Sequence, residues 1–569
     1  MKLSGAEILI ECLIEQQVET IFGFPGGAVL PIYDALYARS DRISHVLTAH
    51  EQHAGHAADG YARRTGRTGV CLATSGPGAT NLVTAIATAY MDSSPVVFIT
   101  GNVPQSLMGT DSFQEADISG MTMPVTKHNY LVHSVEKLAP TLREAFFIAA
   151  SGRPGPVLVD IPKDVQVAET EYVPLSGDAL IPPLSAKHPT VQLRPSGEAL
   201  ERYKTKAQPR LEKAAQLIAE AHRPLIYCGG GVILSGAEAE LLALAERVDA
   251  PVVSSLMGLG AVPATNPRML GMLGMHGTHA ANIAMQRCDL LIAVGVRFSD
   301  RALGKAAAFA PSAKVLHIDI DRAEINKNVT TTLHITGDAR LVLELLLSRV
   351  SRKHHELWMQ QACGMAEDYL TDSLFEPRKI LKTIAATAPD ITVATDVGQH
   401  QMWTAQHFPF IHPRQLITSG GLGTMGYGLG SAMGAAAGDP EGNPVVLITG
   451  DGSFRMNLTE LSTIQHYGFP VIVVIFNNGT LGMVRQWQTL FYGHRYSQTT
   501  LDRGPDFVKL ADAYGIEGTR VSDLAAFAEA FAKAVWERKP CIIECMLDID
   551  EMVAPMVAPG SPIDAFCLN

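Results

Sequence analysis

Strand-sized runs of branched aliphatic residues recur along the whole chain, and this recurrence constrains the fold more than any other feature. Typical runs are Pro95–Gly101, Asp289–Gly295 and Pro444–Gly450. Strands that are apolar throughout, rather than alternating, are typical of parallel sheets buried on both faces. Helix-like segments such as Leu211–Ala221 separate them. The alternation predicts an α/β fold built of doubly wound parallel-sheet domains, whose ligands bind beyond the carboxyl ends of the strands.

Two stretches interrupt this pattern and divide the chain. Residues 166–200 are rich in Pro, Ser and Thr and are interpreted as a linker, and residues 350–375 are polar and helix-like. At about 150 residues per domain, 569 residues correspond to three or four domains. We therefore predict three domains of similar size, at residues 1–165, 190–345 and 370–545.

Composition excludes several classes of protein. The net charge is −12 and no run of Lys or Arg could follow a phosphate backbone, which argues against nucleic-acid binding. The longest apolar stretches, such as Val471–Phe476, are far shorter than the ~20 residues of a membrane helix. The first seven residues carry no apolar signal-peptide core, so we expect a cytoplasmic protein. The eight cysteines include no C-x-x-C pair, and we expect reduced thiols rather than disulfides or a zinc site.

Polar residues follow two successive apolar strands in the last third of the chain. Gly450-Asp451-Gly452 ends one strand and Asn477-Asn478-Gly479-Thr480 ends the next. If the strands are parallel neighbours, Asp451 and Asn478 lie together, and with a nearby main-chain carbonyl, for which Thr480 is the candidate, they form an oxygen site suited to Mg²⁺. The helix that starts after Gly452 favours an anion at the same place. Each segment alone could be an ordinary turn, but together they match the thiamine-diphosphate signature.

A glycine-rich segment, residues 420–428, contains a G-x-G-x-x-G match. Alone it is weak, because a dinucleotide-binding turn and a flexible turn explain it equally well. In thiamine enzymes the corresponding segment carries a bulky apolar residue beneath the cofactor, and Met425 occupies that position here.

A glutamate stands at the start of a small-residue helix near the N-terminus. Glu51 lies in the segment His50–Ala58, which follows a strand-like run. An isolated glutamate at such a place more often only satisfies the start of a helix. Three glycine-bearing or loop-like segments accompany it: Phe22–Ala28, Thr74–Asn81 and Thr110–Glu115.

From about residue 3 to about residue 555 the chain resembles the catalytic subunits of the acetohydroxyacid synthase (acetolactate synthase) family. The most specific stretches are Phe22–Leu36, Thr110–Leu131, Leu273–Thr278, Gly295–Arg301 and Gly482–Tyr492. The resemblance implies domains of the thiamine-diphosphate enzyme type with thiamine diphosphate, Mg²⁺ and FAD as cofactors. It also implies a homodimer or homotetramer, in which the first and third domains of different subunits face each other across the cofactor, and a regulatory small subunit as partner.

The family's reaction follows from the same resemblance. Pyruvate is decarboxylated on thiamine diphosphate, and the two-carbon unit is ligated to a second 2-keto acid in branched-chain amino-acid biosynthesis. Pyruvate as acceptor gives 2-acetolactate, and 2-ketobutyrate gives 2-aceto-2-hydroxybutyrate. Glu51 would hydrogen-bond N1′ of the aminopyrimidine in an apolar environment and favour the imino form that removes the C2 proton. Met425 would hold the cofactor bent.

The acceptor side of the site is also implied by the resemblance. Arg297 matches the candidate for the acceptor carboxylate, with an ion pair to Asp300 or Asp321 as the alternative. Trp487 would form an apolar wall for the acceptor side chain. Further pocket positions implied are Gln114 and Lys163 among the catalytic residues, and Gly27, Ala28 and Phe113 among the substrate-binding residues.

The middle domain carries glycine-bearing segments after several strands, typical of a nucleotide site, although ordinary turns explain each one equally well. The resemblance assigns them to FAD, which in this family has no net redox role. Ser299 stands where the family more often has Asp, a departure that bears on flavin affinity. The cofactor-binding positions implied over the whole chain are Pro25, Thr74, Pro77, Asn81, Arg153, Gly229, Gly230, Gly231, Leu273, Gly274, Met275, His276, Gly277, Gly295, Arg301, Asp319, Asp338, Val397, Gly398, Gln399, His400, Gly423, Gly452, Ser453, Leu481, Gly482 and Met483.

Two alternatives stay open. One is another thiamine enzyme, such as pyruvate oxidase or a simple 2-keto-acid decarboxylase; glyoxylate carboligase is disfavoured because Glu51 is present. The other is a non-catalytic regulatory paralogue, against which the presence of Glu51, Asp451 and Asn478 argues. The products formed from pyruvate distinguish the first, and binding of thiamine diphosphate the second.

Overall fold

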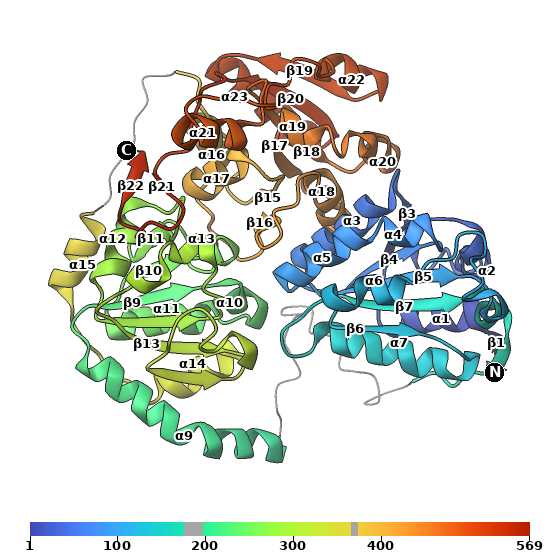
Figure 1. Ribbon diagram of the computed structural model, residues 1–569, viewed down its shortest axis with the longest axis horizontal. Helices are drawn as coiled ribbons and strands as arrows, with labels where there is room; N and C mark the ends of the chain where they lie inside the picture. The colour runs from blue at the N-terminus through green and yellow to red at the C-terminus, as the bar shows by residue number, and fades with distance from the viewer. Residues whose placement is uncertain (176–196, 366–373, 569) are drawn as a thin grey trace.

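The computed structural model describes residues 1–175, 197–365 and 374–568. It contains three six-stranded sheets, one in each third of the chain, and helices cover both faces of each (Figure 1). All neighbouring strands within these sheets run parallel. The predicted α/β fold of three doubly wound parallel-sheet domains is confirmed. Most of the predicted linker lies outside the described residues.

The N-terminal domain has the strand order β3-β2-β4-β5-β7-β6. Its strands are β2 (Thr20–Phe24), β3 (Ser44–Leu47), β4 (Gly69–Ala73), β5 (Val96–Asn102), β6 (His128–Leu131) and β7 (Val157–Pro162). Its helices are α1 (Gly5–Glu15), α2 (Leu30–Tyr37), α3 (Glu51–Thr65), α4 (Pro77–Thr80), α5 (Val83–Asp92), α6 (Ile118–Thr122), α7 (Val135–Ala150) and α8 (Lys163–Val167), and β1 (Lys2–Ser4) pairs with β8 (Glu169–Glu171).

The central domain has the order β11-β10-β9-β12-β13-β14. Its strands are β9 (Pro224–Cys228), β10 (Val252–Ser254), β11 (Met269–Met272), β12 (Leu290–Val294), β13 (Lys314–Asp319) and β14 (Leu333–Thr336). Its helices are α9 (Gly197–Glu220), α10 (Gly230–Ser235), α11 (Glu238–Val248), α12 (His279–Arg287), α13 (Asp300–Leu303) and α14 (Ala339–Leu347), followed by α15 (Glu356–Cys363).

The C-terminal domain has the order β16-β15-β17-β18-β20-β19, the same pattern as the N-terminal domain. Its strands are β15 (Thr392–Thr395), β16 (Leu416–Ile417), β17 (Val445–Gly450), β18 (Val471–Asn477), β19 (Glu517–Val521) and β20 (Cys541–Met546). Its helices are α16 (Pro377–Thr387), α17 (Gln399–His407), α18 (Gly428–Ala437), α19 (Asp451–Phe454), α20 (Leu461–Tyr467), α21 (Gly482–Phe491), α22 (Phe507–Ala513) and α23 (Leu524–Glu537), with a final pair β21 (Met556–Val557) and β22 (Phe566–Leu568).

In each sheet the chain first adds strands on one side and then crosses to the other, and ligands of doubly wound sheets bind at this reversal, beyond the carboxyl ends of the strands. The reversal lies between β2 and β4 in the N-terminal domain, between β9 and β12 in the central domain, and between β15 and β17 in the C-terminal domain. These three places are where a site is expected.

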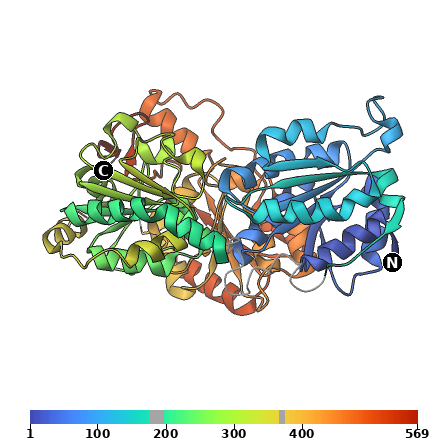
Figure 2. The same cartoon turned by 90° about the horizontal axis from the view of Figure 1, so that it is seen from below.

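The N- and C-terminal domains pack through α3 and α18, which lie side by side (Figures 1 and 2). Small residues allow this approach, since a Cβ at Gly60 would collide with the carbonyl oxygen of Ser431 and one at Gly434 with that of Ala57. Replacing either glycine by Ala would force the helices apart, at a cost of about 1–3 kcal/mol. This contact holds the middle of α3 against the C-terminal domain.

No helix among the described residues is long and apolar enough to cross a membrane.

Candidate active site

Glu51 is the first residue of α3, and its carboxylate has one partner from the neighbouring loop. The Nδ2 of Asn81 donates to its Oε2 at 2.9 Å. Its Oε1 lies beside the bare backbone of Gly78, where a Cβ would be 3.2 Å away. The structure therefore brings Glu51 and Asn81 together and leaves the second carboxylate oxygen close to the backbone of Gly78.

Most of the other predicted residues of the N-terminal domain follow the carboxyl ends of its strands, whereas Arg153 lines the cavity described below. The backbone N–H of Ala28 donates to Thr74 Oγ1 at 3.3 Å, and Lys163 Nζ donates to the carbonyl of Gly27 at 3.0 Å. Pro25 follows β2 and Pro77 begins α4. Gln114 packs against Gly76, whose φ of +55° requires glycine, and the adjacent Phe113 is 88% exposed. These residues form an open N-terminal half-site around Glu51.

A second half-site lies in the C-terminal domain. β17 and β18 are parallel neighbours that pair as far as Gly450 and Phe476, so Asp451 and Asn478 follow adjacent strand ends. Burial raises the pKa of Asp451 to about 7, and a bound cation would favour the ionised form of this carboxylate. The Nδ2 of Asn478 donates to Gln399 Oε1 at 3.1 Å, which leaves its amide oxygen as acceptor. Thr480 is buried, and its hydroxyl donates to the carbonyl of Thr499.

Two helices begin beside these oxygen ligands. α17 starts at Gln399 and α21 at Gly482, and a Cβ at Gly482 would collide with the Gln399 side chain. The ring of His400 is buried, which lowers its pKa to about 3, and its Nε2 has no hydrogen-bond partner among the described residues. Free N–H groups at helix starts and an unsatisfied buried nitrogen are features of a site that binds a polar ligand such as a phosphate.

Met425 lies in the glycine-rich loop before α18, and its neighbours are fixed on both sides. The buried Asp396 accepts hydrogen bonds from the backbone of Gly426 at 2.8 Å and of Tyr427 at 3.0 Å. On the other side, the hydroxyl of Thr424 contacts that of Thr88 in α5 at 2.8 Å. The half-buried Met425 is therefore held in place by both the C-terminal and the N-terminal domain.

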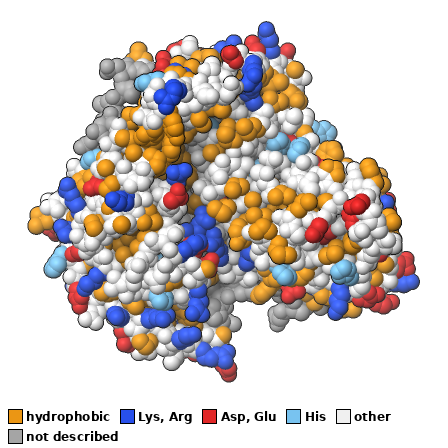
Figure 3. Space-filling view, in the orientation of Figure 1, with side chains coloured by type: hydrophobic (Ala, Val, Ile, Leu, Met, Phe, Trp, Pro, Cys, Tyr) orange, Lys and Arg blue, Asp and Glu red, His pale blue; other side chains and the backbone are white. Residues whose placement is uncertain are grey.

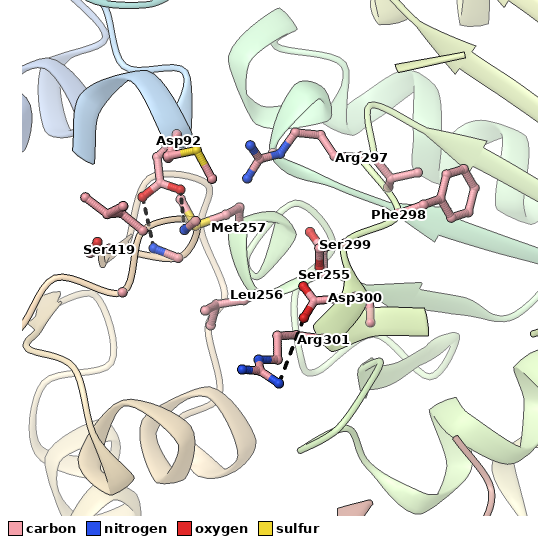
Figure 4. Close-up of a pocket in the computed structure, with 18 of the residues that line it drawn as sticks. Asp92, Ser255, Leu256, Met257, Arg297, Phe298, Ser299, Asp300, Arg301 and Ser419 are labelled. Carbon is pink, nitrogen blue, oxygen red and sulfur yellow. Dashed lines mark hydrogen bonds and ion pairs between the residues drawn. The ribbon is translucent and has the colours of Figure 1, made fainter. Parts of the chain in front are cut away.

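A cavity of about 1340 Å³ extends from the reversal point of the central sheet to α21 (Figure 4). Figure 3 shows Lys and Arg side chains around a hollow between the domains. A Cβ at Gly229 would collide with the backbone at Gly295, so these two strand ends approach too closely for side chains. The predicted residues that line the cavity are Arg153, Gly230, Gly231, Leu273, Met275, His276, Gly295, Arg297, Arg301, Asp319, Asp338, Val397, Gly398, Gly423, Met483 and Trp487.

Two arginines reach this cavity in different directions. Arg297 extends toward the helix that carries Asp92, whereas Arg301 lies on the other side, beside Asp300 (Figure 4). The guanidinium of Arg301 is 5.9 Å from the ring centre of Trp487. Arg301 was predicted to bind cofactor and Arg297 to bind the acceptor, but the structure brings Arg301 to the tryptophan.

The alternative partners considered for Arg297 are engaged elsewhere. Asp321 forms an ion pair with Arg153 at 3.1 Å, and Asp300 lies 3.9 Å from Arg301. Within the described part of the chain Arg297 has no ion pair, and burial together with the neighbouring Arg153 lowers its pKa. Arg297 is therefore a partly buried cation available to an anionic ligand.

Sequence reasoning missed several buried carboxylates around these sites. Asp92 accepts from the backbone of Gly420 and Gly421 and pairs with Arg63, Asp396 holds the Met425 loop, and Glu460 contacts the start of α3. Their partners lie on other elements, from 29 to 411 positions away in the chain, so no local pattern identifies them.

Comparisons with known proteins match nearly the full length of the chain. Models of the thiamine pyrophosphate enzyme N-terminal TPP binding domain, central domain and C-terminal TPP binding domain match residues 3–121, 211–346 and 396–545. A probable acetolactate synthase large subunit of Methanocaldococcus jannaschii is 48% identical over 98% of this chain and 94% of its own. Acetolactate synthase of Arthrospira platensis is 48% identical, over 98% and 96%. The acetolactate synthase isozyme 2 large subunit of Escherichia coli is 46% identical, over 98% of both chains.

The chain belongs to the acetolactate synthase large-subunit family of thiamine pyrophosphate enzymes. The resemblance seen in the sequence is confirmed. In an acetolactate synthase large subunit, the helix starts and the unsatisfied His400 beside Asp451 and Asn478 fit the diphosphate and metal end of thiamine diphosphate.

Proposed function

We propose that this chain is an acetolactate synthase, which decarboxylates pyruvate and ligates the two-carbon unit to a second 2-keto acid. Pyruvate as the acceptor gives 2-acetolactate, and 2-ketobutyrate gives 2-aceto-2-hydroxybutyrate. The observation that carries the proposal is the near-full-length similarity to proteins named acetolactate synthase. The presence of both half-sites, with Glu51 in one and Asp451 and Asn478 in the other, supports an active enzyme over a non-catalytic paralogue.

When bound, thiamine diphosphate supplies a nucleophilic carbon and an electron sink for decarboxylation. Glu51 would hold a proton at the aminopyrimidine N1′ with the carboxylate oxygen that faces Gly78. Asn81 donates to the other oxygen and so fixes the orientation of the carboxylate. Met425, held through Thr424 and Gly426, would support the cofactor from below.

The diphosphate end is assigned to the C-terminal half-site. Asp451, the amide oxygen of Asn478 and the Thr480 carbonyl would hold Mg²⁺, a hard cation that keeps further positions for phosphate oxygens. No cluster of three or more His, Cys, Asp or Glu able to hold a metal exists among the described residues, so the proposed magnesium site is a mixed one. The cofactor-binding residues proposed around it are Val397, Gly398, Gln399, His400, Gly423, Gly452, Ser453, Leu481, Gly482 and Met483.

FAD is proposed for the large cavity. The central sheet has the strand order typical of dinucleotide-binding domains, and the cavity begins at its reversal point. Its volume of about 1340 Å³ exceeds the usual range for a small ligand, and His276 contributes a buried Nδ1 without a partner in the described part of the chain. Asp319 would meet the ribose, and burial raises its pKa to about 7.

The acceptor carboxylate is proposed to bind Arg301 or Arg297. Arg301 has the stronger support because it lies over Trp487, the proposed wall for the acceptor side chain, on the side of the cavity nearest the C-terminal domain. Arg297, which the sequence predicted to bind the acceptor carboxylate, is the competing candidate. Gly27, Ala28, Phe113, Gln114 and Lys163 are proposed to complete the pocket from an N-terminal half-site.

Assembly is part of the proposal. The N-terminal half-site does not line the described cavity, and its Phe113 is largely exposed, which supports a homodimer or homotetramer in which a second copy closes it. Several relatives are named large subunits, which supports a regulatory small subunit as partner. A cytoplasmic location and the predicted domain boundaries belong to the proposal as well.

The deciding experiment analyses the products made from pyruvate, with and without 2-ketobutyrate, by purified protein with Mg²⁺, thiamine diphosphate and FAD. We expect acetolactate that requires thiamine diphosphate, and acetohydroxybutyrate when both acids are present. Acetaldehyde, acetate or acetyl phosphate instead would identify a decarboxylase or an oxidase and contradict the proposal.

A further inference from the structure

A buried carboxylate of the C-terminal domain lies directly against the start of the helix that carries Glu51. Glu460 follows α19 and precedes α20, and its side chain is 0% exposed. Its oxygens accept the backbone N–H of Ala49 and of His50, each at 3.1 Å, and contact His53 Nδ1 at 2.9 Å. More than 400 positions separate these partners in the chain. Glu460 thus joins the C-terminal domain to the N-terminal domain at one point.

This contact fixes the backbone on both sides of the helix start. The N–H groups of Ala49 and His50 precede the first turn of α3, where no helical carbonyl is available to them. His50 in turn accepts the N–H of Gln52 through its Nδ1 at 3.1 Å. His53, one turn into the helix, is tied to the same carboxylate. Glu51 therefore lies between residues that Glu460 holds from both directions.

The strength of the contact follows from its burial. Hydrogen bonds to an ionised carboxylate are shorter and stronger than neutral ones, and removal from water increases their effect. The fourth donor, the hydroxyl of Thr463 at 2.7 Å, orients the carboxylate from its own helix. A fully buried carboxylate with four donors has one fixed position, and it imposes that position on the start of α3.

The same segment also reaches the metal half-site. Residues 451–460 begin at Asp451 and end at Glu460, and Asn457 between them donates to the buried Asp396 at 3.1 Å. The segment therefore connects Asp451 with the residue whose carboxylate holds the backbone beside Glu51. Figure 1 shows α20 beside β3 at this junction.

We propose that Glu460 is a positioning residue, which fixes the backbone around Glu51 from the C-terminal domain of the same chain and so sets the direction of the Glu51 carboxylate. The inference rests on the proposed role of Glu51, since it deepens that role. A shift of about 1 Å in a reacting group can cost up to 10²-fold in rate, so a remote contact of this kind has a measurable effect on turnover.

The test compares Glu460→Gln with Asp439→Asn. The first substitution keeps the volume and removes the charge, and Glu460→Asp, which keeps the charge on a shorter side chain, serves as the conservative variant. Asp439 is the matched control, because its carboxylate also comes from the C-terminal domain and pairs with Arg64 at the opposite end of α3 at 2.8 Å. Three properties are measured: amide hydrogen exchange of cofactor-free protein by mass spectrometry, exchange of the C2 proton of bound thiamine diphosphate, and turnover.

In Glu460→Gln we expect faster amide exchange in residues 45–56 and a kcat about tenfold lower, with the KM for pyruvate within about twofold and slower C2 exchange. Glu460→Asp should recover part of the amide protection, of the C2 exchange rate and of the turnover. In Asp439→Asn the faster amide exchange should be confined to residues 60–68, with turnover near that of the wild type.

Unchanged amide exchange in residues 45–56, or faster exchange there with unchanged C2 exchange and turnover, would overturn the inference. The amide measurement needs no cofactor, so it remains informative if the wild-type protein makes no acetolactate. A wild-type protein that makes no acetolactate would contradict the proposed function. Unchanged amide exchange in Glu460→Gln would contradict only the role of Glu460.

Discussion

At the residue scale, the carboxylate of Glu51 is the group on which turnover should depend most. Glu51→Gln keeps the contact with Asn81 but cannot hold a proton as a carboxylate does. We expect the turnover number to fall by about 10²- to 10⁴-fold, the usual contribution of a general acid or base, with little change in melting temperature. Steady-state kinetics and thermal unfolding measure the two effects. Glu212→Gln, on the exposed face of α9, is the control, and unchanged turnover in Glu51→Gln would contradict the proposed role.

Arg301 and Arg297 can be distinguished by substituting each with Gln. If Arg301 binds the acceptor carboxylate, Arg301→Gln loses a charge-assisted hydrogen bond worth about 1.5–3 kcal/mol, or roughly 10- to 150-fold in kcat/KM for the acceptor. We expect a smaller loss for Arg297→Gln, because that side chain extends toward the helix of Asp92 (Figure 4), whereas Arg301 lies over Trp487. Competition between pyruvate and 2-ketobutyrate gives the comparison. A larger loss in Arg297→Gln would restore the assignment made from the sequence.

Single residues differ in how far the sequence could predict their surroundings. Asp451 and Asn478 were predicted to be neighbours because both follow strands, and the pairing of β17 with β18 confirms their adjacent positions. The contact of Asn81 with Glu51 forms only when the folded chain brings the two residues together, so no local sequence pattern predicts it. Arg297 and Arg301 are four positions apart, so sequence spacing could not decide which one faces Trp487.

At the element scale, an acidic residue at the end of α5 holds the first part of the loop that carries Met425. Asp92 accepts from the backbone of Gly420 and Gly421 at 2.9 and 2.7 Å and is itself paired with the buried Arg63. In Asp92→Asn the amide NH₂ replaces one carboxylate oxygen and faces a backbone N–H, so two donors meet. An unsatisfied buried donor lowers the free energy of unfolding by about 1–3 kcal/mol. We expect faster amide exchange in residues 418–427 and weaker thiamine diphosphate binding by calorimetry. Glu240→Gln, which weakens an ion pair between α11 and α14, should change neither property.

A pH effect is expected in the N-terminal sheet, where Asp160 of β7 accepts from Thr100 and Asn102 of β5. Burial raises the pKa of Asp160 from its usual value near 4 to about 7. Between these values the folded state binds the proton and the unfolded state does not, so this group's contribution to stability is lost as the pH rises. The melting temperature of the wild type, relative to that of Asp160→Asn, should fall as the pH rises from 4 to 7. Above pH 7 the difference between the two proteins should change little. A difference that does not vary with pH would contradict the expectation.

The elements themselves follow from local chemistry, but their contacts do not. The run Asp289–Gly295 predicts a strand because it is apolar throughout, and β12 spans Leu290–Val294 with every residue buried. The glycines of α18 give no such local signal. They are needed because α3, which is far away in the sequence, packs closely against them. Strand prediction needs only the local pattern, whereas the contact between α3 and α18 depends on the arrangement of two domains.

At the scale of the whole molecule, the two half-sites have different surroundings in one chain. The C-terminal residues Val397, Gly398 and Met483 line the large cavity, whereas Glu51 lies at the start of α3, where Glu460 joins it to the C-terminal domain. The α3–α18 contact sets the distance between the two half-sites within a chain. Activity then depends on whether Glu51 acts with Asp451 of its own chain or of a second copy.

Mixing two inactive variants decides between these arrangements. Glu51→Gln damages the N-terminal half-site, and Asp451→Asn damages the C-terminal one. If each site combines halves of two copies, a mixed dimer has one site with both defects and one intact site, so an equimolar, fully exchanged mixture should recover about one quarter of wild-type turnover by random pairing. If both halves come from one chain, every site keeps a defect and the mixture stays inactive.

Subunits are exchanged by dilution and reconcentration, with each variant alone as the control, and acetolactate formation is the measurement. Recovery would establish the shared site, and its absence despite verified exchange would assign both halves to the same chain.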